Sequence, residues 1–228
     1  MFENFLVNSA LPKRKQIGIL IASMIIFSFA VFMMLTYSLS TREVFSWDLQ
    51  LTEDIQSFTY LTFPMILVSG FGYLSVTITL FLLVLGFLYR KGYQKEAAFV
   101  PAILLAPGLN VLIKELVARP RPNEAFVNVF EPLPQYSYPS GHVMYYVVFF
   151  GFLAFLAISL PKLEPRWRIV WLLLSLPLIF LVGVSRIYLG AHWPSDVVGA
   201  YLFGGLYLMV LILIYLRYVY KISNVGNK

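Results

Sequence analysis

Six long apolar runs constrain what this chain can fold into more than any other feature. They cover residues 17–39, 71–89, 97–117, 143–160, 167–184 and 197–216. A helix of about 20 apolar residues crosses the hydrocarbon core of a bilayer and satisfies its own backbone polar groups there. Hydrophobic residues make up 60% of the chain and charged residues 12%, against roughly half and roughly a quarter in soluble domains. We therefore expect one all-α domain over 1–228, a polytopic membrane bundle with six transmembrane helices.

Two of the six runs have features of their own. The first is 23 residues long, too long for the apolar region of a cleaved signal peptide, so we expect it to be retained as a span. The third contains Pro101 and Pro107, which interrupt a helix unless neighbouring helices cover the freed backbone groups. We expect this span to be the least regular. We also expect 63–70 to lead into the second span through a turn bounded by Gly70 and Gly72.

Basic residues are distributed unequally between the two sides of these spans. Loops on the side of the N-terminus hold 12 of the 17 Lys and Arg residues and three of the 11 acids. Because cytoplasmic loops are enriched in Lys and Arg, we expect both termini in the cytoplasm of a cell-membrane protein. The same distribution attributes the net charge of +6 to membrane topology, so we expect no nucleic-acid partner. Four of the five outer basic residues, Lys114, Arg119, Arg121 and Arg186, then require another explanation.

The segment 44–58 lies between the first two runs on the outer side. Its apolar residues recur at helical spacing, at Val44, Trp47, Leu51, Ile55 and Phe58. Asp48, Glu53 and Asp54 lie off that stripe. This pattern predicts an amphipathic helix at the outer interface of the membrane, either packed on the bundle or acting as a lid or a rail for lipid entry.

Two outer segments place polar groups where spans end or begin. The third run ends in Arg119-Pro120-Arg121-Pro122, which cannot remain helical because each proline pushes the preceding residue toward extended geometry. The fourth run begins with Pro139-Ser140-Gly141-His142, a pattern typical of a helix N-terminus. Its backbone N–H groups favour a bound anion, and the glycine permits close approach. The alternative is an ordinary helix cap, which leaves His142 unexplained.

A third outer segment, residues 185–196, lies between the last two runs. It holds Arg186, His192 and Asp196, and polar groups beside a bilayer predict function because they are costly there. Pro194 and Asp196 also suit the first turn of the following helix. His192 and Asp196 are four residues apart, about one helical turn, so a cap and a side-chain contact between them are compatible.

These three segments together predict a phosphate site. Lys114, Arg121 and Arg186 can neutralise phosphoryl oxygens, and backbone N–H groups near Ser140 and Gly141 can complete the cradle. A histidine nucleophile needs a carboxylate on its other ring nitrogen, which Asp196 can supply to His192. His142 is then available as the general acid and base. The remaining outer acids are scattered, so we expect a reaction without metal or other cofactor. Because His192 attacks while neutral and His142 donates while protonated, we also expect the rate to have a bell-shaped dependence on pH.

The motifs carry a family resemblance. Lys114-x6-Arg121-Pro122, Pro139-Ser140-Gly141-His142 and Ser185-Arg186-x5-His192-x3-Asp196 resemble, in order and in spacing, the three-part signature of the type 2 phosphatidic acid phosphatase superfamily. The resemblance covers residues 114–196. It implies a membrane phosphatase that hydrolyses lipid phosphates at the outer face without magnesium. It also implies residue roles: a phosphohistidine on His192, orientation by Asp196, acid–base work by His142, and phosphoryl binding by Lys114, Arg121, Ser140, Gly141 and Arg186. Arg119 lies outside the signature and could contact substrate or lipid headgroups.

Several alternatives remain open at this stage. The substrate could be phosphatidylglycerophosphate, phosphatidate or a polyprenyl pyrophosphate, as in bacterial members of the phosphatidylglycerophosphatase B or undecaprenyl pyrophosphate phosphatase type. The same histidine could pass the phosphoryl group to an acceptor other than water. A non-catalytic transporter or scaffold could use the outer cations to bind anions. Soluble haloperoxidases share the signature, but six spans argue against them. The small residues Ala200 and Gly204 could pack helices within the chain or between chains, so the oligomeric state is open.

Overall fold

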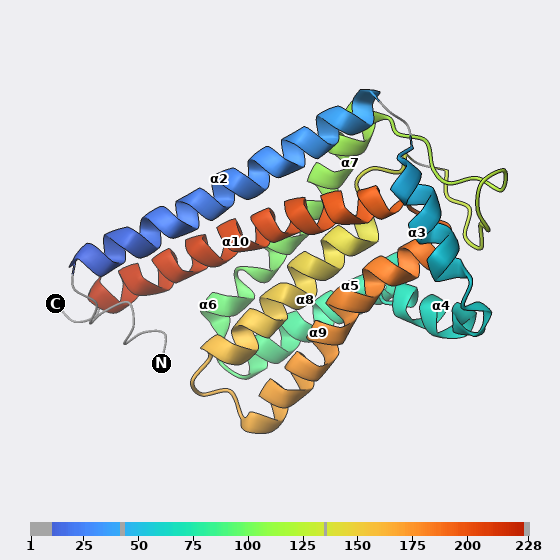
Figure 1. Cartoon of the computed structure of the whole chain (residues 1–228). Coiled ribbons are helices and arrows are strands. Elements are labelled where there is room, and N and C mark those ends of the chain that lie inside the picture. Colours follow the sequence, from blue (N-terminus) through green and yellow to red (C-terminus); the bar gives the residue numbers. More distant parts are fainter. Residues whose placement is uncertain (1–10, 42–43, 135, 226–228) are drawn as a thin grey trace.

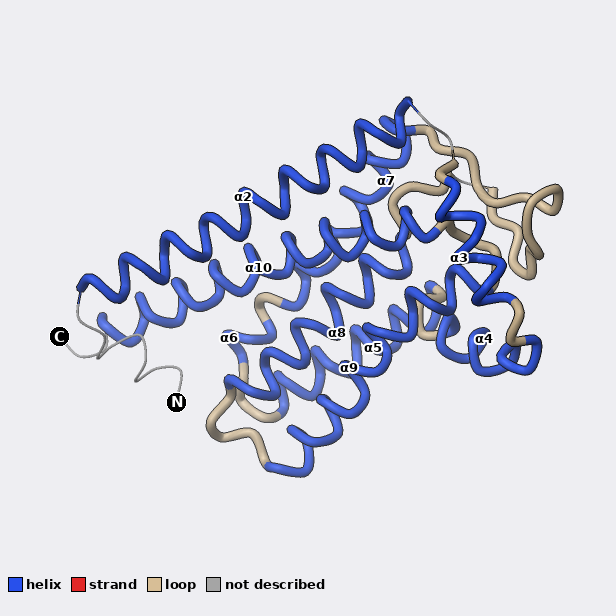
Figure 2. Tube along the Cα trace, in the orientation of Figure 1, coloured by secondary structure: helices blue, strands red, loops and turns tan. Residues whose placement is uncertain are grey.

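The chain forms a bundle of long helices in a computed structural model that describes residues 11–41, 44–134 and 136–225 (Figure 1). Within those ranges the regular elements are α- and 3₁₀-helices, and Figure 2 shows helices joined by loops without a strand. The charged residues Glu3, Arg42, Glu43 and Lys228, which entered the charge count, lie outside these ranges. The all-α expectation is confirmed for the part of the chain that the structure describes.

The elements follow one another in this order. They are α2 (Leu11–Thr41), α3 (Ser46–Gln56), η1 (Thr59–Leu61), α4 (Thr62–Gly70), α5 (Leu74–Arg90), α6 (Gln94–Ala97), η2 (Val100–Leu104), α7 (Leu105–Val117), α8 (Gly141–Ser159), α9 (Pro165–Tyr188) and α10 (Pro194–Val225). In Figure 1, α2 begins and α10 ends at one end of the bundle, whereas α3, α4 and the loop after α7 lie at the other end. This arrangement is consistent with an even number of crossings.

Five helical segments of the described chain are long and apolar enough to cross a membrane. The count becomes six if the pair Thr59–Gly70 and Leu74–Arg90, bent by 51°, forms one span, so the expected six-span bundle is confirmed within that range. The bend falls at the turn that Gly70 and Gly72 predict. The third span, Gln94–Val117, is interrupted by 3₁₀-helix η2, which contains Pro101. A proline has no N–H to donate, so the α-helical ladder breaks there, as expected.

The core of the bundle is α8. It is hydrophobic all around, and 78% of its 18-residue window is buried inside the protein, in contact with α9, α10 and α7. Helix α10 comes close to it at Gly204, where an added Cβ would lie 3.2 Å from the Cβ of Val147. Ala200 is fully buried. The small-residue pair therefore serves packing within the chain.

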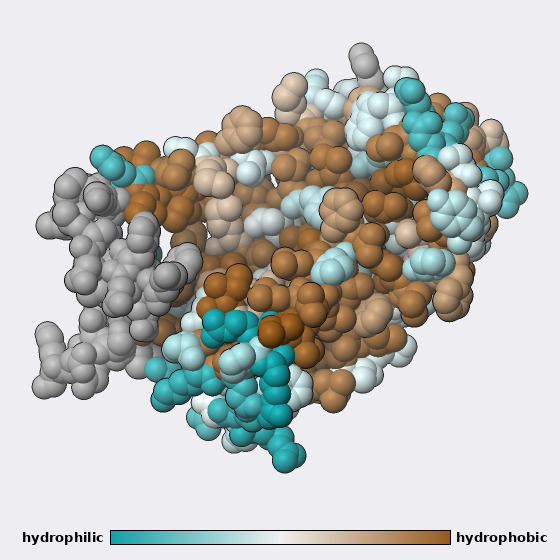
Figure 3. All heavy atoms as spheres, turned by 60° about the horizontal axis from the view of Figure 1, so that its bottom comes forward, coloured by the Kyte–Doolittle hydropathy of each residue, from teal (hydrophilic) through white to brown (hydrophobic). Residues whose placement is uncertain are grey.

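The outer surface of the bundle is apolar between two polar ends. Figure 3 shows a brown, hydrophobic band over the helices, with teal, hydrophilic residues gathered on either side of it. Helix α2 contributes to this surface, since 6% of its spanning window is buried and it packs mainly along α10. Side chains such as Phe27 and Met34, which are 71% and 74% exposed, suit a lipid environment rather than water.

Helix α9 extends farther than the sequence indicated. The fifth run was expected to end at residue 184, but α9 continues to Tyr188, so Arg186 lies in its last turn and not in a loop. The extra turn is buried against α4, where Ser185 Oγ donates a hydrogen bond of 2.6 Å to the carbonyl of Met65. Gly190 follows with a left-handed φ of +65°, which ends the helix. The polar residues of 185–196 are therefore held by two helices and a short turn.

Helix α3 is the amphipathic helix expected between the first two spans, but its orientation was not foreseen. Its polar residues Asp48, Thr52 and Gln56 are buried against the bundle at spacings of four. Its apolar residues Trp47 and Leu51 are each 40% exposed. The polar stripe therefore packs on the protein and the apolar stripe faces outward. A position at the membrane interface stays a prediction.

Candidate active site

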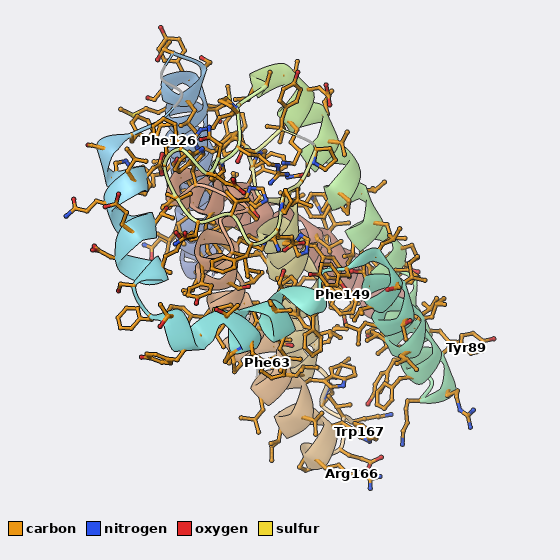
Figure 4. The ribbon with its side chains drawn as sticks, turned by 90° about the vertical axis from the view of Figure 1, so that its right-hand side faces the viewer. Phe63, Tyr89, Phe126, Phe149, Arg166 and Trp167 are labelled. Atoms are coloured by element: carbon orange, nitrogen blue, oxygen red, sulfur yellow. The ribbon has the colours of Figure 1, made fainter. Side chains whose placement is uncertain are left out.

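The three predicted segments meet at one end of the bundle. Figure 4 looks onto this end, with Phe126 on the loop that crosses it, and with Arg166 and Trp167 at the far end of α9. The loop follows α7, and the starts of α8 and α10 meet beneath it: the N–H of Ser140 donates to the carbonyl of Asp196 at 3.3 Å. Two helix N-termini, with the positive ends of their dipoles, thus lie side by side.

His192 lies beside Asp196, as their spacing predicts. Its Nδ1 is 3.6 Å from Asp196 Oδ2, longer than a hydrogen bond, and this buried nitrogen has no hydrogen-bond partner. The same carboxylate oxygen accepts the N–H of Trp193 at 2.8 Å, the reach-back bond of a capping box at the start of α10. One carboxylate therefore caps the helix and faces the imidazole. Such contacts commonly tighten when substrate binds.

The other ring nitrogen of His192 faces a cation. Arg121 Nη1 lies 3.3 Å from His192 Nε2 and donates to the carbonyl of Ala191 at 2.5 Å. Burial lowers the pKa of Arg121 to about 10. Burial also lowers the pKa of His192 well below its usual value, and so do its charged neighbours Arg121, Lys114, Arg186 and His142. The structure thus brings both predicted histidines and all three predicted cations together, in surroundings that favour the neutral form of His192.

Lys114 and Arg186 carry the other two charges. Lys114 is buried in the last turn of α7, and its Nζ donates to the carbonyls of Tyr136 and Ser137. Arg186 is fully buried, and its Nη1 donates to Ser69 Oγ and, at 2.7 Å, to the carboxylate of Glu131. The Nε and Nη2 of Arg186 are buried without a hydrogen-bond partner. Unsatisfied buried donors are rare in folded proteins, and these two are available to an anionic ligand.

The start of α8 has the expected form. Ser140 is its N-cap, with Oγ accepting the N–H of Val143 at 3.5 Å. A Cβ added to Gly141 would lie 3.1 Å from Asn110 Oδ1, so the glycine lets α7 come close. The ring of His142 packs over Gly72 in the α4–α5 turn, and its buried Nε2 has no hydrogen-bond partner.

Arg119 occupies a different place from the one considered on sequence grounds. Its guanidinium is fully buried between two carboxylates, with Nη1 2.5 Å from Asp196 Oδ1 and Nη2 2.8 Å from Asp48 Oδ2. Of the two alternatives left open for Arg119, contact with lipid headgroups does not fit the structure, because the side chain has no exposed surface.

Sequence reasoning missed four residues that contact the site. Asp48 was placed on a free polar face and Glu131 among scattered acids, whereas each pairs with an arginine of the site. Ser69 and Gly72 come from the α4–α5 region, which carried no polar motif. Only Asp48 had a usable signal, since Asp48, Thr52 and Gln56 repeat every four residues and indicate a polar stripe that can be buried.

A cavity of about 220 Å³ opens beside this cluster. Arg121 and Glu131 line it, together with Leu133 and Gly190. It connects the arginine next to His192 with the carboxylate next to Arg186, so a ligand entering it meets both charges. Gly190 is required at its edge, because a Cβ there would lie 2.1 Å from the carbonyl oxygen of Asn128.

Fold and site together define a multi-pass helical membrane protein with a buried cationic site that contains two histidines. Residues 95–220 match the sequence model of the PAP2 superfamily, and the chain belongs to that superfamily. The family resemblance carried by the three motifs is thereby confirmed.

Two curated relatives are similar to parts of the chain. An undecaprenyl-diphosphatase of Sulfolobus acidocaldarius is 35% identical over 146 residues, covering 61% of this chain and 64% of the relative. Phosphatidylglycerophosphatase B of Bacillus subtilis is 36% identical over 100 residues, covering 42% of this chain and 46% of the relative. The chain thus spans less than two thirds of the length of either relative.

Solved structures share the fold over more of the chain. The crystal structure of a transmembrane PAP2 type phosphatidylglycerolphosphate phosphatase from Bacillus subtilis has a TM-score of 0.69 and 25% identity, covering 85% of this chain and 96% of that one. LpxE of Aquifex aeolicus has a TM-score of 0.53 and 24% identity, which shows a similar fold.

Proposed function

We propose that the protein is an integral membrane phosphatase that hydrolyses lipid phosphates through a phosphohistidine on His192. The observation that carries this proposal is the set of buried, unpartnered polar atoms at the site, His142 Nε2 and the Nε and Nη2 of Arg186. These atoms belong to groups that lie close enough to the imidazole of His192 to lower its pKa. A tetrahedral phosphoryl group, with its oxygens on the arginine and its phosphorus facing His192, would satisfy them.

The first chemical step is attack of His192 Nε2 on phosphorus. The N–P bond forms, the bond from phosphorus to the leaving oxygen breaks, and His142 gives that oxygen its proton. Asp196 holds the Nδ1–H of His192 and stabilises the positive charge that develops on the phosphorylated ring. The low pKa of His192 supports this role, because only the neutral imidazole has a free electron pair at Nε2.

Water completes the reaction in the second step. His142, now neutral, takes a proton from a water molecule that attacks phosphorus, the N–P bond breaks, and inorganic phosphate leaves with His192 restored. Lys114, Arg121 and Arg186 hold the three non-bridging oxygens in both steps, with backbone N–H groups at Ser140 and Gly141. An acceptor alcohol in place of water would make the protein a phosphotransferase, the second activity that this site could support.

The substrate class we propose is a lipid with a terminal phosphate or diphosphate. Two relatives, an undecaprenyl-diphosphatase and a phosphatidylglycerophosphatase, support it. The apolar band on the face shown in Figure 3 also supports it, because a lipid substrate can stay in the bilayer while its headgroup enters the site. Phosphatidylglycerophosphate, phosphatidate and a polyprenyl diphosphate are the three candidates.

We propose that the site faces the outside of the cell membrane and that both termini are cytoplasmic. The distribution of Lys and Arg supports this orientation, as does the position of the site opposite to the start of α2 and the end of α10. The chain has no cysteine, so single cysteines report sidedness cleanly. In whole cells, a membrane-impermeant maleimide should label Glu124→Cys and leave Lys162→Cys unlabelled; the reverse pattern would contradict the orientation.

We also propose that turnover needs no metal ion. Among the described residues, no group of three or more His, Cys, Asp and Glu side chains is placed to hold one. The carboxylates of Asp48 and Asp196 are tied to Arg119, and that of Glu131 to Arg186. The cations that neutralise the phosphoryl group are then side chains of the protein itself.

The test is phosphate release by the purified, detergent-solubilised protein from the three candidate lipids in the presence of EDTA. We expect turnover on at least one of them, loss of turnover in His192→Ala, and an acid-labile ³²P adduct in the wild-type protein. Adding glycerol as an acceptor and measuring phosphoglycerol against free phosphate separates transfer from hydrolysis. Phosphate release that persists in His192→Ala would sink the proposal.

A further inference from the structure

The carboxylate of Asp48 links α3 to the catalytic end of α10. Its Oδ1 accepts the N–H of Ser195 at 2.8 Å, and its Oδ2 accepts the Ser195 hydroxyl at the same distance. The N–H of Ser195 belongs to the first turn of α10 and would otherwise lack an acceptor. Asp48 thus caps a helix that lies about 150 residues away in the sequence.

The same carboxylate shares an arginine with Asp196. Arg119 donates from Nη2 to Asp48 and from Nη1 to Asp196 and to Ser195 Oγ, and the side chains of the ion-paired groups have no exposed surface. Two carboxylates and one guanidinium leave this group with one net negative charge. Removal of Asp48 would leave Arg119 and Asp196 to cancel each other.

The net negative charge of this group is important because most of the charged groups around His192 are cations. The charged and titratable groups that act on it are Arg121, Lys114, Arg186, His142 and Asp196. All of them except Asp196 are cations or can become cations. A ring that gains positive charge when it is phosphorylated needs a net negative partner on its Nδ1 side, and a neutral Arg119–Asp196 pair would be a poor one.

We propose that Asp48 and Arg119 are positioning residues for the His192 nucleophile, which act by fixing the Asp196 carboxylate and by keeping the buried group that faces His192 at a net negative charge. The inference rests on the proposed function. It makes α3 part of the catalytic apparatus: the inner face of this helix holds the carboxylates in place, while Trp47 and Leu51 face outward.

The first variant is Asp48→Asn, which keeps the shape of the side chain and removes its charge. The matched control is Asp54→Asn, the same substitution at an exposed position of the same helix. We expect kcat on the lipid substrate to fall about 10- to 100-fold in Asp48→Asn, with KM within about threefold of wild type. The acid limb of kcat, meaning the pH range in which kcat falls as the pH decreases, should move to lower pH. The reason is that the loss of negative charge near His192 lowers its pKa in the substrate complex. Asp54→Asn should match the wild type in both.

The second variant, Asp48→Asn with Arg119→Gln, removes a carboxylate and a guanidinium together. It restores the net negative charge, which Asp196 then carries alone, and Asp196 keeps the hydrogen bonds from the N–H of Trp193 and the hydroxyl of Ser137. We expect the acid limb of kcat to return to its wild-type position. A purely structural role predicts the opposite: kcat and thermal stability would fall further, and the acid limb would not move in either variant.

All rates are compared per folded molecule, using the monodisperse fraction from gel filtration and the amount of phosphohistidine formed in a single turnover. Wild-type kcat in Asp48→Asn, or a double variant whose acid limb differs from wild type by a pH unit or more, would overturn the inference. A wild-type protein without turnover, or one whose turnover survives His192→Ala, would instead overturn the proposed function and this inference with it.

Discussion

The contact between Gly72 and His142 permits a sharp test of the general acid. A Cβ added to Gly72 would lie 2.2 Å from His142 Cδ2 and 2.8 Å from its Nε2. Ordinary van der Waals contact begins near 3.4 Å, so the ring must move by about 1.2 Å in Gly72→Ala. A displacement of about 1 Å at a reacting group can cost roughly 100-fold in rate.

The loss should depend on the leaving group. For a lipid phosphate, whose leaving alkoxide needs a proton, kcat/KM should fall about 100-fold in Gly72→Ala. For p-nitrophenyl phosphate, whose leaving group is stable without a proton, kcat/KM should fall less than about tenfold. The backbone itself should tolerate the change, because Gly72 does not have a positive φ and the overlap falls on the end of the His142 side chain.

The assay is phosphate release from both substrates, with Gly70→Ala as the control. Gly70 lies in the same turn region, and a Cβ there would meet no heavy atom within 4 Å. We expect this control to keep wild-type kcat/KM on both substrates. Equal losses of kcat/KM on the two substrates in Gly72→Ala would refute the reasoning, because they would point to a general disturbance of the site and not to the displaced acid.

Three further predictions follow from other parts of the site. The lowered pKa of His192 keeps it neutral down to pH values below about 6.5, so the acid limb of kcat/KM should lie below that value. The limb of kcat should lie at higher pH, since bound phosphate favours the charged ring; a pH profile of both constants checks this. Glu131→Gln removes a negative charge from Arg186 and should tighten inhibition by inorganic phosphate about fivefold, and an unchanged inhibition constant would argue against a shared arginine. Gly190→Ala combines a φ of +65° with a backbone clash and should lower thermal stability by more than Gly92→Ala, which has a φ of +80° and open space.

The sequence indicated which residues the structure brings together at this end of the bundle, but it did not indicate most of the residues that hold them there. His192 and Asp196 could be paired from a spacing of four, because a capping residue and its neighbour one turn away lie on the same face. Lys114, Arg121 and Arg186 could be grouped because basic residues on the outer side of a membrane protein are disfavoured without a purpose. Both inferences use local geometry and charge, which a single sequence contains.

The residues that hold the site in place do so through contacts between segments that are distant in the sequence. Local sequence patterns do not reveal such contacts. Nothing near Glu131 indicates that it meets Arg186, 55 residues later. Gly72 suits any turn, and its place under the His142 ring follows only from how the α4–α5 turn packs. Arg186 was placed in a loop because an arginine ends an apolar run, whereas burial against α4 extends the helix by another turn.

Helix α3 and the turn between α4 and α5 lie within the first 90 residues of the chain. Their position limits how the protein can be divided into fragments. Every group to which we assign a role in the proposed reaction lies between Lys114 and Asp196, inside the stretch that matches the superfamily. Asp48, Ser69 and Gly72, which hold three of those groups in place, come before it. The chemistry and its alignment therefore belong to separate parts of the chain, so a fragment that begins at residue 95 would carry all three motifs and still lack the parts that align them. Grafting the motifs onto another bundle would meet the same obstacle.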